Sequence, residues 1–431
     1  MMVTGIIVVV IFVAVAALMI SKKLPTVLAL PLMAVLIAVA AGLPLKGDEG
    51  ILTYVIPQGA LKLASTYVAI LFSCWLSRIL YRTGVSATII KKAAELGGDK
   101  PLVVSLLLCA ASVFLFTVLY GTGAVAMVGA IVLPIMLSVG VPPMVACNSF
   151  LAAMTAGYML NPANIAAVTN ITGVEQGSMY TAAIILTVLS CIFCVGILVW
   201  GFKKEGKKYA FAAEIPGSDG EEIEPVKGIR GFLACMTPFV VVLVMLIFNL
   251  DAITVFLIGI IWLMIMTVKG SWSKYCSMIV QSCYEGFKEG APTASLMFGI
   301  GMLINAMTAP TTQAAIEPFM QAITPTTAIG LILFVCILSP GSLYRGPFNI
   351  LGLGAGLAAS MMAVDAVPIL ALSVAFYATL RWPTQSCPTS TQVVWCANFV
   401  GYEPTTVAMK VFWPNWIVTA LSVVILVLMY M

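Results

Sequence analysis

The chain has 431 residues, of which 61% are hydrophobic and 9% are charged, and its mean hydropathy is +1.10. About a quarter of the residues of soluble globular domains are charged, so this composition excludes a soluble fold. The chain has no histidine, which removes the usual base of catalytic triads and a common zinc ligand. The basic residues follow loops between apolar runs and form no nucleic-acid-binding patch. We therefore predict a helical polytopic membrane protein that is not an enzyme and binds no nucleic acid.

Apolar runs long enough to cross a bilayer as helices recur along the whole chain. The first run lacks a basic leader and a cleavage site, so we expect it to be retained as a span. Ten crossings are predicted, at about residues 4–20, 25–43, 61–80, 145–172, 180–200, 231–249, 251–268, 291–308, 366–400 and 411–430.

Two further pairs of apolar segments are interpreted as re-entrant hairpins rather than as crossings. The first hairpin covers about 102–138 and turns at "YGTGA", and the second covers about 326–363 and turns at "SPGSLYRGPFN". Glycine and proline at both tips favour a tight turn.

Lysine and arginine predict the orientation of the chain, because cytoplasmic loops are enriched in both. With ten crossings, nearly all basic residues fall on one side, together with the polar stretch 203–230. The opposite side receives little beyond Lys46 and the interfacial Lys62. We therefore place the 203–230 loop in the cytoplasm.

The order of elements is the same in the two halves of the chain, 1–202 and 231–431. Each half has scaffold helices (about 4–80 and 231–308), then a hairpin, an interrupted span and a closing span. An offset of 226 residues aligns Phe150 with Phe376 and Pro162 with Pro388. Because five crossings is an odd number, the second half is expected to be inverted. Inverted repeats with broken helices are typical of secondary transporters, although internal duplication also occurs in some channels.

Two polar interruptions stand inside predicted spans: "LNPAN" at 160–164 and "RWPTQSCPTST" at 381–391. Non-helical backbone at membrane depth is tolerated where it is buried in protein or lines a wet cavity. Freed carbonyls and hydroxyls suit a hard cation such as sodium, and helix N-termini suit an anion. A proline kink alone would also explain either break, but two breaks at equivalent places favour binding.

The candidate substrate-binding residues come from the two hairpin tips and the two breaks, which we expect to meet near mid-membrane. They are Thr122, Gly123, Asn161, Asn164, Ser342, Arg345, Asn349, Arg381, Thr384, Ser386, Thr389 and Ser390. A sodium ion is predicted near Thr122, Asn161, Ser342 and Ser386.

Arg345 and Arg381 are the charged residues predicted to lie deepest in the membrane, where ionised side chains are costly and functional by default. Each guanidinium needs a counter-ion, and a carried anion would supply it through bidentate hydrogen bonds. The alternatives are that Arg345 reaches the interface and that Arg381 pairs with helix-end carbonyls. Glu285 and Glu289 flank Lys288 and are interpreted as interfacial, which disfavours a cation exchanger with a carboxylate at mid-membrane.

The order of these motifs, with "LPIMLSVGVPP" (133–143) and "GIGMLINAM" (299–307), resembles the ion transporter superfamily of bacterial secondary carriers. Its members include citrate, C4-dicarboxylate and gluconate permeases, and the layout is most similar to the citrate and gluconate types. The resemblance implies sodium- or proton-coupled uptake of an organic anion, a homodimer, and a mobile transport domain that moves as an elevator against a static scaffold. It also implies the inner membrane of a prokaryote. The alternative is a sodium/proton or other cation antiporter on the same fold.

Overall fold

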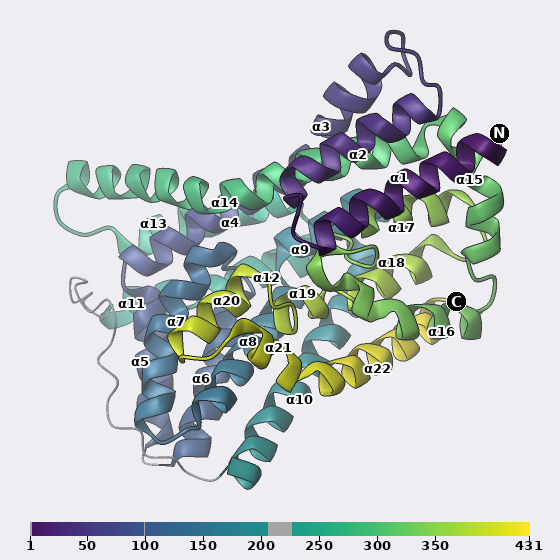
Figure 1. Ribbon diagram of the computed structural model, residues 1–431. Coiled ribbons are helices and arrows are strands. Elements are labelled where there is room, and N and C mark those ends of the chain that lie inside the picture. The colour runs from purple at the N-terminus through teal and green to yellow at the C-terminus, as the bar shows by residue number, and fades with distance from the viewer. Residues whose placement is uncertain (1, 99, 206–225) are drawn as a thin grey trace.

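The computed structural model describes residues 2–98, 100–205 and 226–431, where all regular structure is helical (Figure 1). The helices of residues 2–205 are α1 (Met2–Ile20), α2 (Thr26–Ala40), the π-helix η1 (Ile51–Gln58), α3 (Gly59–Lys62), α4 (Ala64–Arg82), α5 (Val85–Gly97), α6 (Pro101–Phe116), α7 (Gly121–Ser138), α8 (Pro143–Met159), α9 (Pro162–Thr172), the 3₁₀ turn η2 (Gln176–Met179) and α10 (Tyr180–Glu205).

The helices of residues 226–431 range from 5 residues in α19 to 37 residues in α14. They are α11 (Gly228–Cys235), α12 (Thr237–Phe248), α13 (Ala252–Thr267), α14 (Trp272–Thr308), α15 (Pro310–Ile323), α16 (Ala328–Leu338), the 3₁₀ segment η3 (Ser339–Arg345), α17 (Gly354–Ala363), α18 (Ile369–Ala378), α19 (Arg381–Gln385), α20 (Thr391–Phe399), α21 (Pro404–Lys410) and α22 (Phe412–Tyr430).

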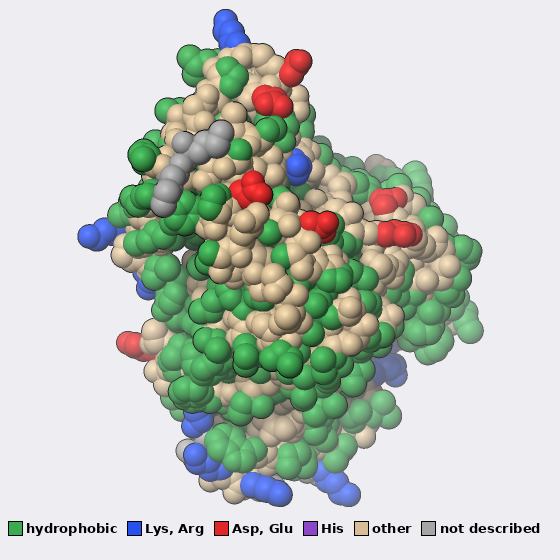
Figure 2. All heavy atoms as spheres, turned by 90° about the vertical axis from the view of Figure 1, so that its right-hand side faces the viewer, with side chains coloured by type: hydrophobic (Ala, Val, Ile, Leu, Met, Phe, Trp, Pro, Cys, Tyr) green, Lys and Arg blue, Asp and Glu red, His purple; other side chains and the backbone are tan. Residues whose placement is uncertain are grey.

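The surface of the molecule exposes larger apolar patches than a soluble monomeric protein normally does. Large hydrophobic side chains such as Leu28, Ile247 and Ile329 are more than 60% exposed. Figure 2 shows hydrophobic side chains over much of the drawn face and a group of Lys and Arg at its lower end. By length and composition, seven helices of the described residues are able to cross a membrane, or nine if each bent pair is one span. The protein is therefore a multi-pass helical membrane protein.

The predicted count of ten crossings differs from this result for identifiable reasons. Helices α2 and α13 are apolar but have 15 and 16 residues, which is short for a span. The predicted span 366–400 is divided among α18, α19 and α20. Conversely, α7 and the segment Ala328–Arg345 are each long enough to cross, although we expected both to be halves of hairpins.

The predicted break at "LNPAN" is confirmed, because α8 and α9 meet there at 58°. Asn161 caps α9 with its side-chain oxygen, which accepts from the Ala163 amide at 3.0 Å, and Pro162 occupies the first helical position. Proline at this position leaves no amide without a partner and has the helical φ. The break is thus encoded by two adjacent residues.

A second bend, of 50° between α11 and α12, lies inside the span 231–249 that we predicted to be continuous. Pro238 has no amide hydrogen to donate to the carbonyl of Ala234, four residues earlier. The hydroxyl of Thr237 donates to that carbonyl instead, at 2.6 Å. The proline therefore explains this bend.

The predicted break in "RWPTQSCPTST" is also confirmed. Helix α19 ends at Gln385 and α20 begins at Thr391, so residues 386–390 are not helical. The neighbouring α18 ends earlier, at Ala378, where the Thr379 hydroxyl donates to the carbonyl of Phe348 at 2.7 Å. This bond ties the interrupted segment to the loop that follows the second hairpin tip.

Helix α14 runs across the molecule and joins its parts (Figure 1). It packs on α2, α3 and α4 of the first half and on α15 and α17 of the second. Glycines make these approaches close: a Cβ at Gly286 would lie 2.7 Å from the backbone of Trp75. Small residues at such contacts let membrane helices pack tightly without a hydrophobic driving force.

Candidate functional site

A cavity of about 270 Å³ lies where the two segments predicted as hairpin tips meet both breaks. Its wall is formed by the start of α7, the α8–α9 junction, the loop after η3, and the second break from α19 to α20. The predicted residues that line it are Thr122, Asn164, Arg345, Asn349, Thr384, Thr389 and Ser390. Segments far apart in the chain thus supply one site.

The two breaks are in direct contact beside this cavity. The hydroxyl oxygens of Thr155 on α8 and Thr384 on α19 are 3.0 Å apart. The Tyr377 hydroxyl of α18 donates to the carbonyl of Met159, the last residue of α8. The ends of the first and second interrupted segments are therefore held together by hydrogen bonds.

Arg345 is the cationic side chain in the lining. Its Nη1 donates to the Leu351 carbonyl at 3.1 Å, which fixes the guanidinium against the loop that follows. Tyr344 and Arg345 both have positive φ, +55° and +58°. Such strain costs on the order of 1–3 kcal/mol per residue and clusters at functional sites. The tip is held to the second break, where the Cys387 sulfur accepts from the Tyr344 amide at 3.3 Å.

The rest of the lining is rich in hydrogen-bonding groups. Helix α7 begins at the cavity with Gly121 and Thr122, and α20 begins there with Ser390 as its N-cap. The Ser390 hydroxyl is buried and has no hydrogen-bond partner. No aspartate or glutamate is among the described residues that line the cavity. Helix N-termini, hydroxyls and a guanidinium together suit an anion.

Arg381, by contrast, does not line the cavity. Its side chain is fully buried against α10, where Nη1 donates to the Ser190 hydroxyl and the guanidinium lies 5.1 Å from the Phe193 ring centroid. Its Nε and Nη2 have no partner. The prediction that Arg381 and Arg345 approach one ligand is therefore not supported by their placement.

Asn161 and Gly123 also lie outside the lining. The Asn161 amide nitrogen donates to the carbonyls of Phe116 and Leu119, both at 3.2 Å, so its side chain holds the end of α6 against the break. Gly123 packs against the carboxylate of Glu289 instead of facing the cavity. Asn161 therefore positions the neighbouring backbone, whereas Gly123 leaves room for the Glu289 carboxylate.

The four residues expected near a sodium ion are not brought together in the lining, which includes Thr122 alone. Ser386 accepts a hydrogen bond from the Asn415 amide at 3.2 Å. Ser342 is buried and its hydroxyl has no partner. In the described part of the chain, no cluster of three acidic or cysteine ligands forms a metal site.

The sequence did not single out several residues that line the cavity: Tyr120, Tyr158, Thr293, Cys387 and Gln392. The rings of Tyr120 and Tyr158 are stacked, with centroids 5.4 Å apart, and join the first tip to the first break. Tyr120 opens the "YGTGA" tip and Gln392 follows the second break, so proximity to these motifs was the available signal.

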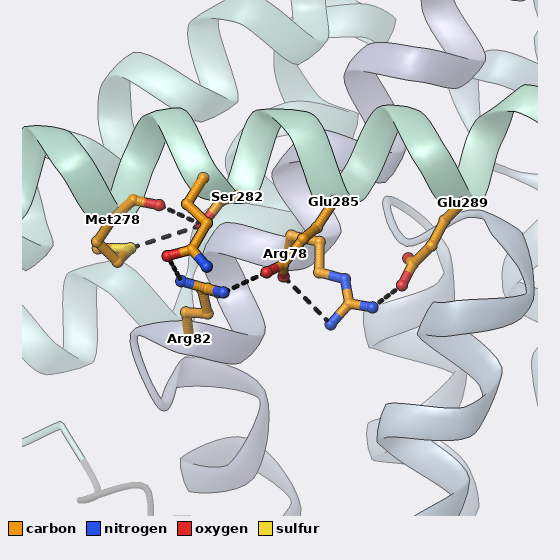
Figure 3. A network of polar contacts seen from close by, with 7 residues as sticks. Arg78, Arg82, Met278, Ser282, Glu285 and Glu289 are labelled. Carbon is orange, nitrogen blue, oxygen red and sulfur yellow. Dashed lines mark hydrogen bonds and ion pairs between the residues drawn. The ribbon is translucent and has the colours of Figure 1, made fainter.

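A network of ion pairs joins α4 to α14 close to the first hairpin tip (Figure 3). Arg78 pairs with Glu289 and lies 3.7 Å from Glu285, which also pairs with Arg82. A Cβ at Gly123 would lie 2.0–2.1 Å from the Glu289 carboxylate atoms, so the carboxylate rests on the first turn of α7. The network therefore connects two long helices to a helix that begins at the cavity.

Glu285 and Glu289 were predicted to lie at the interface, and their arginine partners were not predicted. The spacing of these residues could have indicated the pairing. Arg78 and Arg82 are one helical turn apart, and so are Glu285 and Glu289, so two such helices can bring the two pairs together. Glu289 is one turn from Thr293, which lines the cavity. It is thus a largely buried carboxylate near the site, with a side chain that is 12% exposed.

A scan against protein-family models matches none of them, and a search of curated proteins gives no significant match. The functional conclusion therefore depends on the chemistry of this cavity.

Proposed function

We propose that the protein is a secondary active transporter that moves a small organic anion across the membrane, coupled to sodium or protons. The observation that carries this proposal is Arg345, held in a cavity that both broken segments and both hairpin tips line. The described lining offers it no acidic partner. A di- or tricarboxylate or a sugar acid would supply the counter-charge, and the lining hydroxyls and amides would bind its remaining oxygens.

We propose further that the chain is a distant member of the ion transporter superfamily, built as an inverted repeat of 1–202 and 231–431 and active as a homodimer. The order of elements supports this: α6–α7, α8–α9 and α10 correspond to α16–α17, α18–α20 and α22. In the elevator mechanism, the hairpins and broken helices would move together against the scaffold helices. Their mutual contacts through Thr155, Thr384 and Tyr377 favour movement as one body.

A cation antiporter on the same fold is the second candidate, and Glu289 is the observation that favours it. A largely buried carboxylate one turn from the cavity is the type of group that such antiporters titrate. Its pairing with Arg78 argues against this role, because the arginine neutralises it. We propose no enzymatic activity, since the chain has no histidine to serve as a base.

Uptake by purified protein in liposomes tests the proposal. Radiolabelled citrate, succinate and gluconate are offered with a sodium gradient, a proton gradient or neither. We expect uptake of at least one anion with one of the gradients, and its loss in Arg345→Gln, since the neutral amide removes the counter-charge. Arg230→Gln, at an exposed position on α11, is the matched control. Normal uptake by Arg345→Gln would refute the site, and sodium/proton exchange without anion uptake would establish the antiporter.

We propose the inner membrane of a prokaryote as the location, with the 203–230 loop in the cytoplasm. Residues 206–225 of that loop lie outside the described residues. The group of Lys and Arg at one end of the molecule in Figure 2 supports a fixed orientation.

A further inference from the structure

One face of α4 is bonded to the backbone of the segment between α6 and α7, which was predicted as the first hairpin tip. The Ser73 hydroxyl donates to the Val118 carbonyl at 2.6 Å, and the Ser77 hydroxyl accepts from the Tyr120 amide at 3.2 Å. The Cys74 sulfur donates to the Tyr120 carbonyl at 3.5 Å. The three side chains of α4 are fully buried. We call this set of bonds the α4 contact.

The same segment is bonded to the first break as well as to α4. The Asn161 amide nitrogen donates to the carbonyls of Phe116 and Leu119, both at 3.2 Å. The ring of Tyr120 stacks on that of Tyr158, which lies at the end of α8. Tyr120 also lines the cavity. The segment therefore lies between α4 and the first break, and it carries part of the cavity wall.

Ion pairs hold α4 to α14, whereas the α4 contact consists of neutral groups. Arg78 and Arg82 of α4 pair with Glu285 and Glu289 of α14 (Figure 3). Hydrogen bonds between charged groups are about twice as strong as those between neutral groups. The bonds that join α4 to α14 are thus stronger than the bonds that join α4 to the segment.

The start of α7 meets α4 and α14 with two glycines. A Cβ on Gly121 would lie 3.1 Å from the Cys74 sulfur, and a Cβ on Gly123 would overlap the Glu289 carboxylate. Small residues allow such close contact between helices. Because neither glycine has a side chain, none has to pass another at these two positions when α7 moves away.

The same face of α4 carries two further hydroxyls, which contact α9. The Asn170 amide nitrogen donates to the hydroxyls of Ser65 and Thr66, both at 2.9 Å. Thr66 and Ser73 are about two helical turns apart and lie on one face. Since α9 follows the first break, α4 contacts this part of the molecule at two places, and the bonding groups are neutral at both.

We propose that the α4 contact is the boundary between the static and the mobile part of the transporter, and that it breaks and re-forms in each transport cycle. This inference rests on the proposed function and its elevator mechanism. Helices α4 and α14 stay together through their ion pairs, while α6 and α7 move with the broken helices. The backbone groups that are freed need new partners at membrane depth, and the hydroxyls along α4 supply them.

Cys74 allows a matched pair of cross-links to test this boundary, because two glycines lie close to its sulfur. A Cβ on Gly121 of α7 would be 3.1 Å away, and a Cβ on Gly290 of α14 would be 3.3 Å away, both within reach of a disulfide bond. The other ten cysteines are replaced. Gly121→Cys then cross-links across the boundary, and Gly290→Cys cross-links within the static part.

Anion uptake in liposomes is measured before oxidation, after oxidation and after reduction, and intact mass confirms each disulfide. We expect oxidation of Gly121→Cys to lower the uptake rate at least tenfold and reduction to restore it. Gly290→Cys should keep its uptake rate after oxidation. Unchanged uptake by cross-linked Gly121→Cys would show that the segment does not leave α4, and loss of uptake in cross-linked Gly290→Cys would show that α4 and α14 separate. Either result would overturn the inference, whereas absence of uptake in the wild type would refute the proposed function.

A second cross-link across the boundary avoids the strain at Gly121, which has a φ of +88° and lines the cavity. It joins Gly123→Cys to Glu289→Cys in a cysteine-free protein. The Glu289 carboxyl carbon, which a Cβ at 123 would overlap, is two bonds from its own Cβ, so the two cysteines are within reach of each other. Oxidation should again stop uptake reversibly, and unchanged uptake by this cross-linked protein would also overturn the inference.

Discussion

The hydroxyl oxygens of Thr155 and Thr384 are 3.0 Å apart, although 229 positions separate the two residues in the chain. Thr155 belongs to the helix that precedes the first break, and Thr384 belongs to the short helix that precedes the second. The two interrupted segments thus meet through a direct polar contact, next to the cavity that contains Arg345.

Replacement of either threonine by valine keeps the shape and removes the contact. We expect Thr155→Val and Thr384→Val each to lower the free energy of unfolding by about 1 kcal/mol, the usual worth of a net hydrogen bond. The double variant should lose less than the sum, because the two residues share one bond. Denaturation in detergent measures all three. Thr172→Val, which removes a bond within α9, is the control and should be additive with Thr384→Val.

The buried guanidinium of Arg381 gives a second prediction. Because two of its nitrogens lack partners and Ser190 is neutral, its burial is costly. We expect Arg381→Met to retain anion uptake. Its free energy of unfolding should equal that of the wild type or exceed it by up to about 4 kcal/mol. Uptake and thermal unfolding in detergent measure the two effects. Loss of uptake in a folded Arg381→Met protein would show that Arg381 takes part in binding.

The ion pair between Arg78 and Glu289 gives a third prediction. Glu289→Gln leaves Arg78 with the more distant Glu285 as its acidic partner. We expect the free energy of unfolding to fall by about 1–3 kcal/mol, since a largely buried charge loses its counter-charge. Glu285→Gln is the matched control; its side chain is 32% exposed, and the loss should be below about 1 kcal/mol. Equal losses of unfolding free energy in the two variants would contradict the inference that the more buried Glu289 contributes more than Glu285.

The close approach of Gly123 to the Glu289 carboxylate gives a fourth prediction. A methyl group there would displace the Glu289 carboxylate, which a Cβ would approach within 2.1 Å, and would break its pair with Arg78. We expect Gly123→Ala to destabilise the wild type but to cost little in a Glu289→Ala protein, where the space is free. Unfolding of the four proteins of this cycle measures the coupling. Equal costs in both backgrounds would show that Gly123 is needed for another reason.

The predicted orientation is tested with single cysteines in a cysteine-free protein. Lys227→Cys and Gln321→Cys are both at exposed positions. We expect a membrane-impermeant maleimide to label them from opposite sides of the membrane, with position 227 accessible only from the cytoplasm. Labelling of both positions from one side would overturn the topology.

The breaks at 160–164 and 381–391 were predictable because proline and a capping asparagine act within a few residues of themselves. "LNPAN" contains the local signals for its bend, the capping Asn161 and the helix-starting Pro162, and the Asn161 amide also bonds the end of α6. The bend at Pro238 was open to the same reasoning and was missed because the surrounding run is uniformly apolar.

The direction of the Arg381 side chain was not predictable, because it depends on α10 packing against α19. Likewise, the burial of Glu289 depends on α4 and α7 approaching one side of α14. Composition places such charges in or near the membrane, but only the assembly of distant helices decides whether each one meets a partner, a cavity or neither.

The sulfur of Cys387 lies in the wall of the cavity that Arg345 lines, and among the described lining residues Cys387 is the one cysteine. The reactivity of this thiol therefore reports whether the cavity is occupied by a ligand. In a variant that keeps Cys387 and replaces the other ten cysteines, the rate of alkylation would fall as a passenger molecule shields the sulfur. A collection of unlabelled compounds could then be ranked by the protection that each one gives, before any of them has been followed across a membrane.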